Sequence, residues 1–224
     1  MRSFATFFGL SFSALLPLIN PLGSALVFLG LIGSAPSSVY RTLARRIAAN
    51  TILFLLVIEV SGTLLLKFFG ISLPVMQVSG GLVLAAMGWT MLNQQQPVAK
   101  NQTIRKAARD DAAFASWDSQ TFYPLTFPIT AGPGCVVVMV TLSAHASAKG
   151  IVPDVAAHAG IALAVVVLSV AVYFCYGFAP AITARVAPQT VQGILRVIAF
   201  VLMCIGVQIT WNGASALLKT VLAP

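Results

Sequence analysis

Charged residues are scarce in this sequence. Asp, Glu, Lys and Arg make up 8% of its 224 residues, whereas 58% are hydrophobic and the mean hydropathy is +0.94. Soluble domains carry about 25% charged residues, so this composition excludes an ordinary soluble protein. The length instead suits one compact bundle of membrane-spanning helices in a lipid bilayer, without a sizeable domain outside it.

Side chains that bind metals or act in catalysis are equally few. The three cysteines lie far apart in apolar surroundings, and the two histidines, His145 and His158, lie near the ends of predicted spans and form no motif. We interpret Cys135, Cys175 and Cys204 as small buried hydrophobes. With no paired acids, Ser–Lys dyad or phosphate loop, the sequence predicts no enzyme, metal or cofactor.

Positive charge exceeds negative, and the formal net charge is +8. The cations form no dense patch, so we do not predict nucleic-acid binding. They fit membrane topology better, because loop cations are retained in the cytoplasm. Eight fall on one side of the predicted spans and four on the other: Arg41, Arg45, Arg46, Lys100, Arg105, Lys106, Arg109 and Arg185 against Arg2, Lys67, Lys149 and Lys219.

Long apolar runs dominate the remainder. Each is long enough to cross the hydrocarbon core of a membrane, which takes about 20 helical residues. We predict six segments at 4–32, 47–66, 71–93, 121–145, 153–182 and 190–218, the first and fourth broken by Pro and Gly. The domains are then a three-helix unit at 1–96, a polar cytoplasmic loop at 97–120 and a second three-helix unit at 121–224.

The two units resemble each other. "PLINPLGSAL" (17–26) and "PLTFPITAGPG" (124–134) share Pro-Leu-x-x-Pro, and "LVLAAMGW" (82–89) is weakly similar to "FVLMCIGV" (200–207). A duplicated unit with an odd number of spans inserts upside down relative to its twin. The predicted fold is therefore all-α, with two inverted three-helix repeats, an architecture whose binding sites lie near the midplane.

The pair Asn20-Pro21 interrupts the first apolar segment. Asn is a preferred N-cap and Pro is favoured at the first helical position, so the pair predicts a new half-helix in mid-membrane. Thr130 to Gly134 offers the same chemistry in the second unit. Pro21 corresponds to either Pro128 or Pro133.

Two helix N-termini would then face one central point, where their partial positive charges favour an anion such as a carboxylate. Carbonyls freed near Ser13, Pro17 and Pro124 would take an ammonium group or a cation. The alternative is a pair of proline kinks without a ligand. The predicted substrate-binding residues are Asn20, Pro21, Gly23, Thr130, Gly132, Pro133 and Gly134.

Glu59 is the one acidic residue deep in a predicted span. Intramembrane acids are functional candidates, so we predict ion coupling; the alternative is a protonated Glu that hydrogen-bonds between helices. Arg196 lies too near its span end for a salt bridge with Glu59 and is expected to snorkel or to line a vestibule.

Gln208 and Asn212 share a helix face, where they either join helices or line the cavity. Small residues in two rows predict close helix packing: Gly81 and Ala85, and Ala156, Gly160 and Ala164.

Four blocks together resemble the MarC family of bacterial inner-membrane proteins: "LLPLINPLGSALVFLGLIG", "FGISLPVMQVSGGLVLAAMGW", "PLTFPITAGPG" and "LRVIAFVLMCIGVQITWNG". The resemblance covers nearly the whole chain. It implies six spans, a plasma-membrane location and a role as a transporter of small neutral amino acids. The predicted site residues except Glu59 fall in the matching blocks.

We therefore expect a secondary transporter of a small zwitterion, a neutral amino acid, driven by a Na⁺ or H⁺ gradient. Two alternatives stay open: an exporter of drugs or metabolites, and a non-transporting scaffold that acts through the 97–120 loop. The expected partners are the substrate and the lipid bilayer, with a homo-oligomer left open.

The cation asymmetry predicts that both termini are periplasmic and that the 97–120 loop is cytoplasmic. Reporters that are active on one side of the membrane only, fused after Pro224, should show periplasmic activity alone. Cytoplasmic activity of the same fusion would reverse the orientation.

Overall fold

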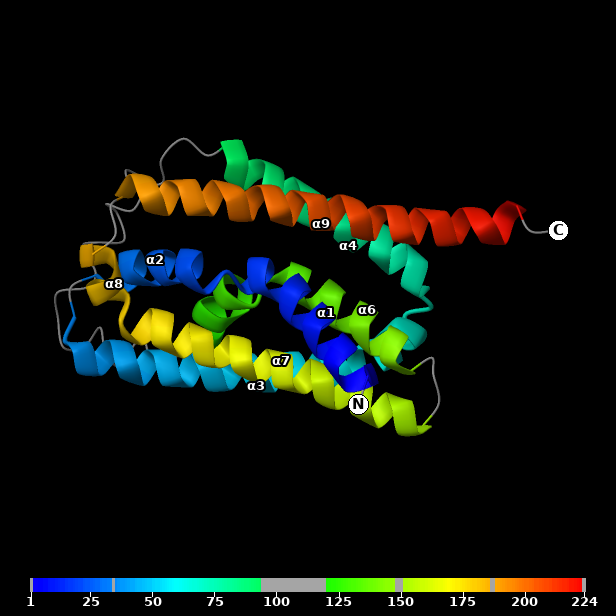
Figure 1. The fold of residues 1–224 in the computed structure, drawn as a ribbon, viewed down its shortest axis with the longest axis horizontal. Coiled ribbons are helices and arrows are strands. Elements are labelled where there is room, and N and C mark those ends of the chain that lie inside the picture. The colour runs from blue at the N-terminus through cyan, green and yellow to red at the C-terminus, as the bar shows by residue number, and fades with distance from the viewer. Residues whose placement is uncertain (1, 34, 94–119, 148–150, 186–187, 223–224) are drawn as a thin grey trace.

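A computed structural model describes residues 2–33, 35–93, 120–147, 151–185 and 188–222 (Figure 1). Within these ranges the chain is helical, with short turns and no strand. Five stretches are long and apolar enough to cross a membrane, and one bent pair of helices makes a sixth if it counts as a single span. The elements are α1 (Arg2–Ile19), α2 (Pro21–Ile32), α3 (Ser37–Phe68), α4 (Leu73–Asn93), η3 (Thr121–Thr130), α6 (Pro133–Ala146), α7 (Ile151–Gly177), α8 (Ala179–Arg185) and α9 (Pro188–Leu222).

The all-α class and the two broken segments are confirmed. The first apolar segment divides into α1 and α2 at the single residue Asn20. The fourth divides into η3 and α6, whose axes differ by 71° across a break at Ala131 and Gly132. Inside η3, Tyr123 and Phe127 have non-helical backbone angles, each before a proline in a cis peptide bond.

The start of the second segment differs from the prediction. α3 begins at Ser37 rather than at 47, so Arg41, Arg45 and Arg46 lie on the first turns of a helix and not in a loop. The guanidinium of Arg41 stacks over the Phe178 ring at 5.1 Å, just before α8 begins. The polar loop predicted at 97–120 lies outside the described residues, apart from its last residue.

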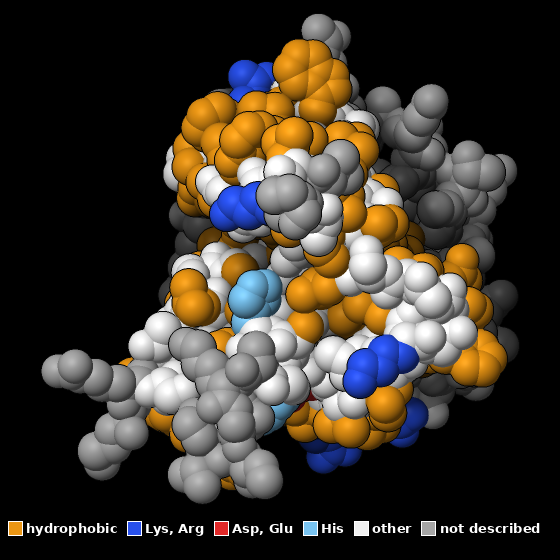
Figure 2. Space-filling view, turned by 90° about the vertical axis from the view of Figure 1, so that its right-hand side faces the viewer, with side chains coloured by type: hydrophobic (Ala, Val, Ile, Leu, Met, Phe, Trp, Pro, Cys, Tyr) orange, Lys and Arg blue, Asp and Glu red, His pale blue; other side chains and the backbone are white. Residues whose placement is uncertain are grey.

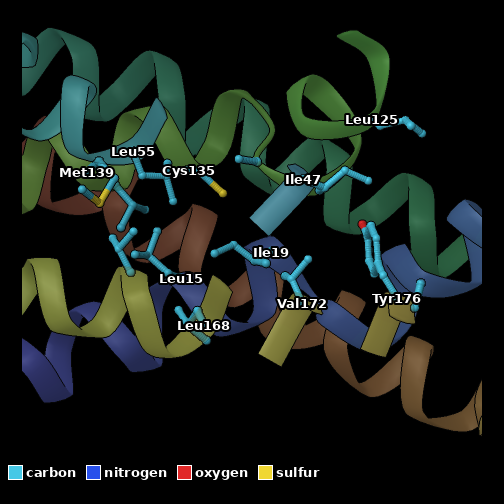
Figure 3. Packing of buried hydrophobic residues seen from close by; sticks show 14 of the residues in the cluster. Leu15, Ile19, Ile47, Leu55, Leu125, Cys135, Met139, Leu168, Val172 and Tyr176 are labelled. Atoms are coloured by element: carbon cyan, nitrogen blue, oxygen red, sulfur yellow. The ribbon is translucent and has the colours of Figure 1, made fainter. Parts of the chain in front are cut away.

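The core lies around α7, which contacts α1, α2 and α3. Its buried face, with Leu168, Val172 and Tyr176, meets Leu15 and Ile19 of α1 and Ile47 of α3 (Figure 3). A Cβ on Gly160 would lie 2.5 Å from the carbonyl oxygen of Phe4, so the backbones of α1 and α7 touch there. The predicted small-residue row is thus a close helix contact at Gly160.

α4 and α9 form a second layer and lie side by side (Figure 1). Glycines bring their backbones together: a Cβ on Gly81 would lie 2.6 Å from the Gly206 carbonyl oxygen, and one on Gly88 2.6 Å from the Met203 nitrogen. A Cβ on Gly213 would lie 2.5 Å from the Pro74 carbonyl oxygen. The close packing predicted at Gly81 is confirmed, and it makes α4 and α9 one unit, hereafter the α4–α9 pair.

Contacts between the two halves are reciprocal. The first segment (α1 and α2) packs on α7, the fourth segment (η3 and α6) packs on α3, and the two third segments are the α4–α9 pair. The start of α1 and the end of α9 lie at the same end of the bundle (Figure 1). The inverted-repeat organisation and the membrane orientation stay predictions.

Replacing Gly206 by Ala should destabilise the protein, because the new Cβ would lie 2.7 Å from the Gly81 carbonyl oxygen, and backbone atoms cannot move aside. We expect a loss of about 2 kcal/mol, or a fall of about 4–8 °C in the unfolding midpoint measured in detergent.

Gly193 on the same helix is the matched control, because nothing lies within 4 Å of its Cβ position. Gly193→Ala should leave the midpoint unchanged or raise it, since Ala favours helix by up to about 1 kcal/mol. Equal effects of the two substitutions would contradict tight α4–α9 packing.

Candidate substrate site at two helix breaks

Asn20 serves two helices at once. Its N–H donates to the Leu16 carbonyl oxygen at 2.9 Å and closes the last turn of α1. Its side-chain Oδ1 accepts the N–H of Gly23 at 3.0 Å and caps the first turn of α2. The backbone is left-handed (φ 42°), a conformation that Asn tolerates better than most residues. One residue thereby supplies two hydrogen bonds at the buried break, one through its backbone and one through its side chain.

The second break uses glycine instead. Gly132 is the N-cap of α6 in an extended conformation and offers no side-chain hydrogen bond; Pro133 occupies the first helical position. Pro133, and not Pro128, therefore takes the place that Pro21 has in α2. Thr130 does not cap α6, because its hydroxyl donates back to the Leu125 carbonyl oxygen at 2.7 Å.

α2 and α6 begin near the middle of the long axis of the molecule and run to opposite ends (Figure 1). Each N-terminus carries a partial positive charge equivalent to roughly half an elementary charge. Gly134, in the first turn of α6, lies against Leu18 in the last turn of α1, so the two breaks are neighbours. The predicted meeting of two half-helices is present in the structure.

Tyr176 connects the two breaks. Its hydroxyl lies 2.8 Å from the Thr130 hydroxyl at the end of η3, and the Ser24 hydroxyl of α2, which donates to the Asn20 carbonyl oxygen at 2.8 Å, lies close to it. Its ring stacks on Phe28 with centroids 4.6 Å apart. Asn20, Ser24, Thr130 and Tyr176 are all buried, and together they form a polar cluster inside an apolar bundle.

The sequence analysis missed Ser24 and Tyr176. Both lie in runs that read as ordinary membrane helix, and α7 carries Tyr176 close to its end. A signal was available: a tyrosine in a buried apolar run needs a hydrogen-bond partner for its hydroxyl. The partner could not be identified without the fold, because Thr130 is 46 residues away.

Leucine side chains occupy the space in front of the site glycines. A Cβ on Gly23 would lie 2.7 Å from Cδ2 of Leu195 in α9, and one on Gly134 would meet Leu84 of α4 and Leu18. The backbone at Gly23 and Gly134 is therefore covered by side chains in this conformation. The α4–α9 pair supplies two of the three covering leucines.

Glu59 has a partner that the sequence analysis did not assign. The residue is buried, and its Oε1 lies 3.0 Å from Nδ1 of His158 on α7. Ser143 of α6 donates its hydroxyl to the Glu59 backbone carbonyl at 2.7 Å. The sequence shows no motif that includes His158, because tertiary packing joins it to a residue 99 positions away.

The other predicted cavity residues do not gather at the breaks. Arg196 is exposed on α9, although its neighbour Leu195 reaches the Gly23 position. Gln208 and Asn212 are exposed and bond to each other, Nε2 to Oδ1, at 2.9 Å. Among the described residues no group of three or more His, Cys, Asp or Glu side chains is arranged to hold a metal ion.

The structure thus has the architecture of a multi-pass membrane protein with two discontinuous helices that meet in its interior. The chain matches the family model "MarC family integral membrane protein" over residues 5–218. It is 31% identical over 217 residues to the inner membrane protein MarC of Salmonella typhimurium, covering 95% of this chain and 96% of that protein. The MarC protein of Escherichia coli O1:K1 is 30% identical over the same shares. The chain belongs to the MarC family; no solved structure matches it.

Asn20→Ala should destabilise the protein more than Asn20→Gly. Both remove the cap on Gly23, but only Ala must hold a strained left-handed backbone, whereas Gly adopts it without cost. We expect the free energy of unfolding to fall by about 2 kcal/mol more in the Ala variant, measured by denaturant titration in detergent. Equal losses would show that backbone conformation at Asn20 is not limiting.

Proposed function

We propose that the protein is a secondary transporter of the bacterial inner membrane that binds a small neutral amino acid where the two helix breaks meet. The observation that carries this proposal is the pair of opposed half-helices, α2 and α6, whose N-termini flank a buried polar cluster. Discontinuous helices of this kind hold substrates in transporters, while uninterrupted backbone hydrogen bonding is the rule elsewhere in the membrane.

The carboxylate of the substrate would bind at the helix N-termini. Prolines at the first position of α2 and α6 have no N–H, and the Gly23 amide is capped by Asn20. The second-position amides of Leu22 and Gly134 remain as first-turn donors. They point along the two helix dipoles, which stabilise an anion between them.

The ammonium group would bind on the oxygen-rich side of the cluster. The hydroxyls of Thr130 and Tyr176 offer acceptor lone pairs, and the Ser24 hydroxyl lies beside them. A zwitterion therefore matches the arrangement better than a free anion or an amine alone. Because side chains crowd Gly23 and Gly134 closely, a substrate with a short side chain suits the site best.

Substrate entry requires displacement of Leu84 and Leu195, and both belong to the α4–α9 pair. Because glycine contacts hold that pair together, a shift of α4 and α9 against the other helices would uncover both half-helix ends in one step. Such rocking of one rigid group of helices against another is how inverted-repeat transporters give alternating access. A gradient of Na⁺ or H⁺ would supply the energy, because the sequence has no nucleotide-binding motif.

Binding of alanine to the purified protein tests the proposal, with alaninamide as the matched ligand that lacks the carboxylate. We expect alaninamide to bind at least about tenfold more weakly, because the helix dipoles no longer meet a negative charge. Asn20→Asp sharpens the test in protein shown to be folded in detergent: Asp caps as well as Asn, but its charge repels the carboxylate and should lower alanine affinity by about tenfold or more.

Asn20→Gly is the control, since it changes the cap without adding charge. No binding of any small neutral amino acid, or equal binding of alanine and alaninamide, would overturn the proposed site.

A further inference from the structure

A buried carboxylate and a partly exposed imidazole form a contact away from the helix breaks. Oε1 of Glu59 lies 3.0 Å from Nδ1 of His158, and the His158 side chain is 34% exposed while that of Glu59 is 5% exposed. Nε2, the second ring nitrogen, lies 3.4 Å from the hydroxyl of Ser147, beyond the end of α6. The ring thus leads from a buried acid toward one end of the bundle, where Figure 2 shows histidine at the surface.

Other titratable groups near the pair do not contact Glu59 in the part of the chain that the structure describes. On α6, His145 is exposed and bonds through Nδ1 to the Thr141 carbonyl oxygen of its own helix. On α3, Lys67 is exposed and lies about 12 Å further along the axis. Asp154, one turn before His158 on α7, has a side chain outside the described residues. Among the described side chains of α6 and α7, His158 is therefore the titratable one that faces Glu59.

We propose that Glu59 and His158 are the proton-binding site through which an H⁺ gradient drives transport; this rests on the proposed function. With the ring proton on Nδ1 and donated to Oε1, Nε2 carries a lone pair that accepts from the Ser147 hydroxyl or takes up a proton. An incoming proton binds at Nε2, and the pair changes from a net charge of −1 to zero. Release of the same proton restores the charge, so no other reactant is needed.

A proton suits this contact better than Na⁺. Hard cations take several oxygen ligands at once, but one carboxylate oxygen here faces a ring nitrogen. Acids and histidines in contact inside membrane bundles are typical of proton relays. Burial of Glu59 makes its charge costly, so occupancy by a proton changes how strongly α3 and α7 attract each other.

The pair is connected to the substrate site by two helices. Ser143 of α6 holds the backbone carbonyl of Glu59, and a Cβ on Gly62 would lie 3.2 Å from Cβ of Val140, so α3 and α6 are in close contact. α6 begins at the site, about 14 Å from Ser143 along its axis. α7 carries both His158 and Tyr176. A proton-dependent shift between α3 and α7 would therefore reach both sides of the substrate site.

Reconstituted protein separates coupling from substrate binding. Alanine exchange across liposomes at equal pH needs substrate binding alone, whereas accumulation driven by an imposed pH gradient needs the proton site as well. In Glu59→Gln and His158→Gln we expect gradient-driven accumulation to fall at least tenfold, while exchange stays within about threefold of wild type. His145→Gln is the control and should keep both activities, since His145 is exposed and bonds to its own helix.

Retained exchange shows that a variant is folded, so the test survives a failure of either substitution alone. Undiminished gradient-driven accumulation in an exchange-competent Glu59→Gln or His158→Gln variant would overturn the proton site. A wild-type protein that exchanges alanine but does not accumulate it in response to the pH gradient would also overturn the proton site. Absence of exchange in the wild type would instead overturn the proposed function, so the two failures are distinguishable.

Discussion

Backbone hydrogen bonding in an apolar environment is the constraint on which this structure depends. A helix that stops inside hydrocarbon leaves N–H and C=O groups without water, at a cost of several kcal/mol each. Asn20 meets that requirement in one residue, because its backbone N–H ends α1 and its side chain begins α2. At the second break, Thr126, Thr130 and Gly132 divide the same task among backbone and hydroxyl groups.

The two breaks have different shapes for this reason. One left-handed residue separates α1 from α2, and the two helices together still form a single apolar stretch from Ser3 to Ile32. Two prolines within η3 and the extended Gly132 prevent a similar continuation, and the chain bends by 71°. Both solutions place a helix N-terminus in the interior, and Tyr176 draws them together through its hydroxyl.

Glycines outside the candidate site hold α4 and α9 together. Contacts through Gly81, Gly88, Gly206 and Gly213 join α4 to α9 so closely that the two helices share backbone contacts along their length. Leu84 of α4 and Leu195 of α9 cover the two breaks. The contact between α4 and α9 is more extensive than the contacts of either helix with the rest of the bundle. The same small residues thus determine which part of the bundle is rigid and where it is able to separate.

Local chemistry was readable in the sequence. Low charge and long apolar runs determined the all-helical membrane class, and Asn-Pro and Gly-Pro determined where two segments break, because capping and the missing proline N–H act within a few residues. Only the tertiary structure decided which side chains complete the site and what covers it. Tyr176 meets Thr130, His158 meets Glu59 and Leu195 covers Gly23 across long stretches of chain, and such contacts depend on how helices pack, which a hydrophobic period does not encode.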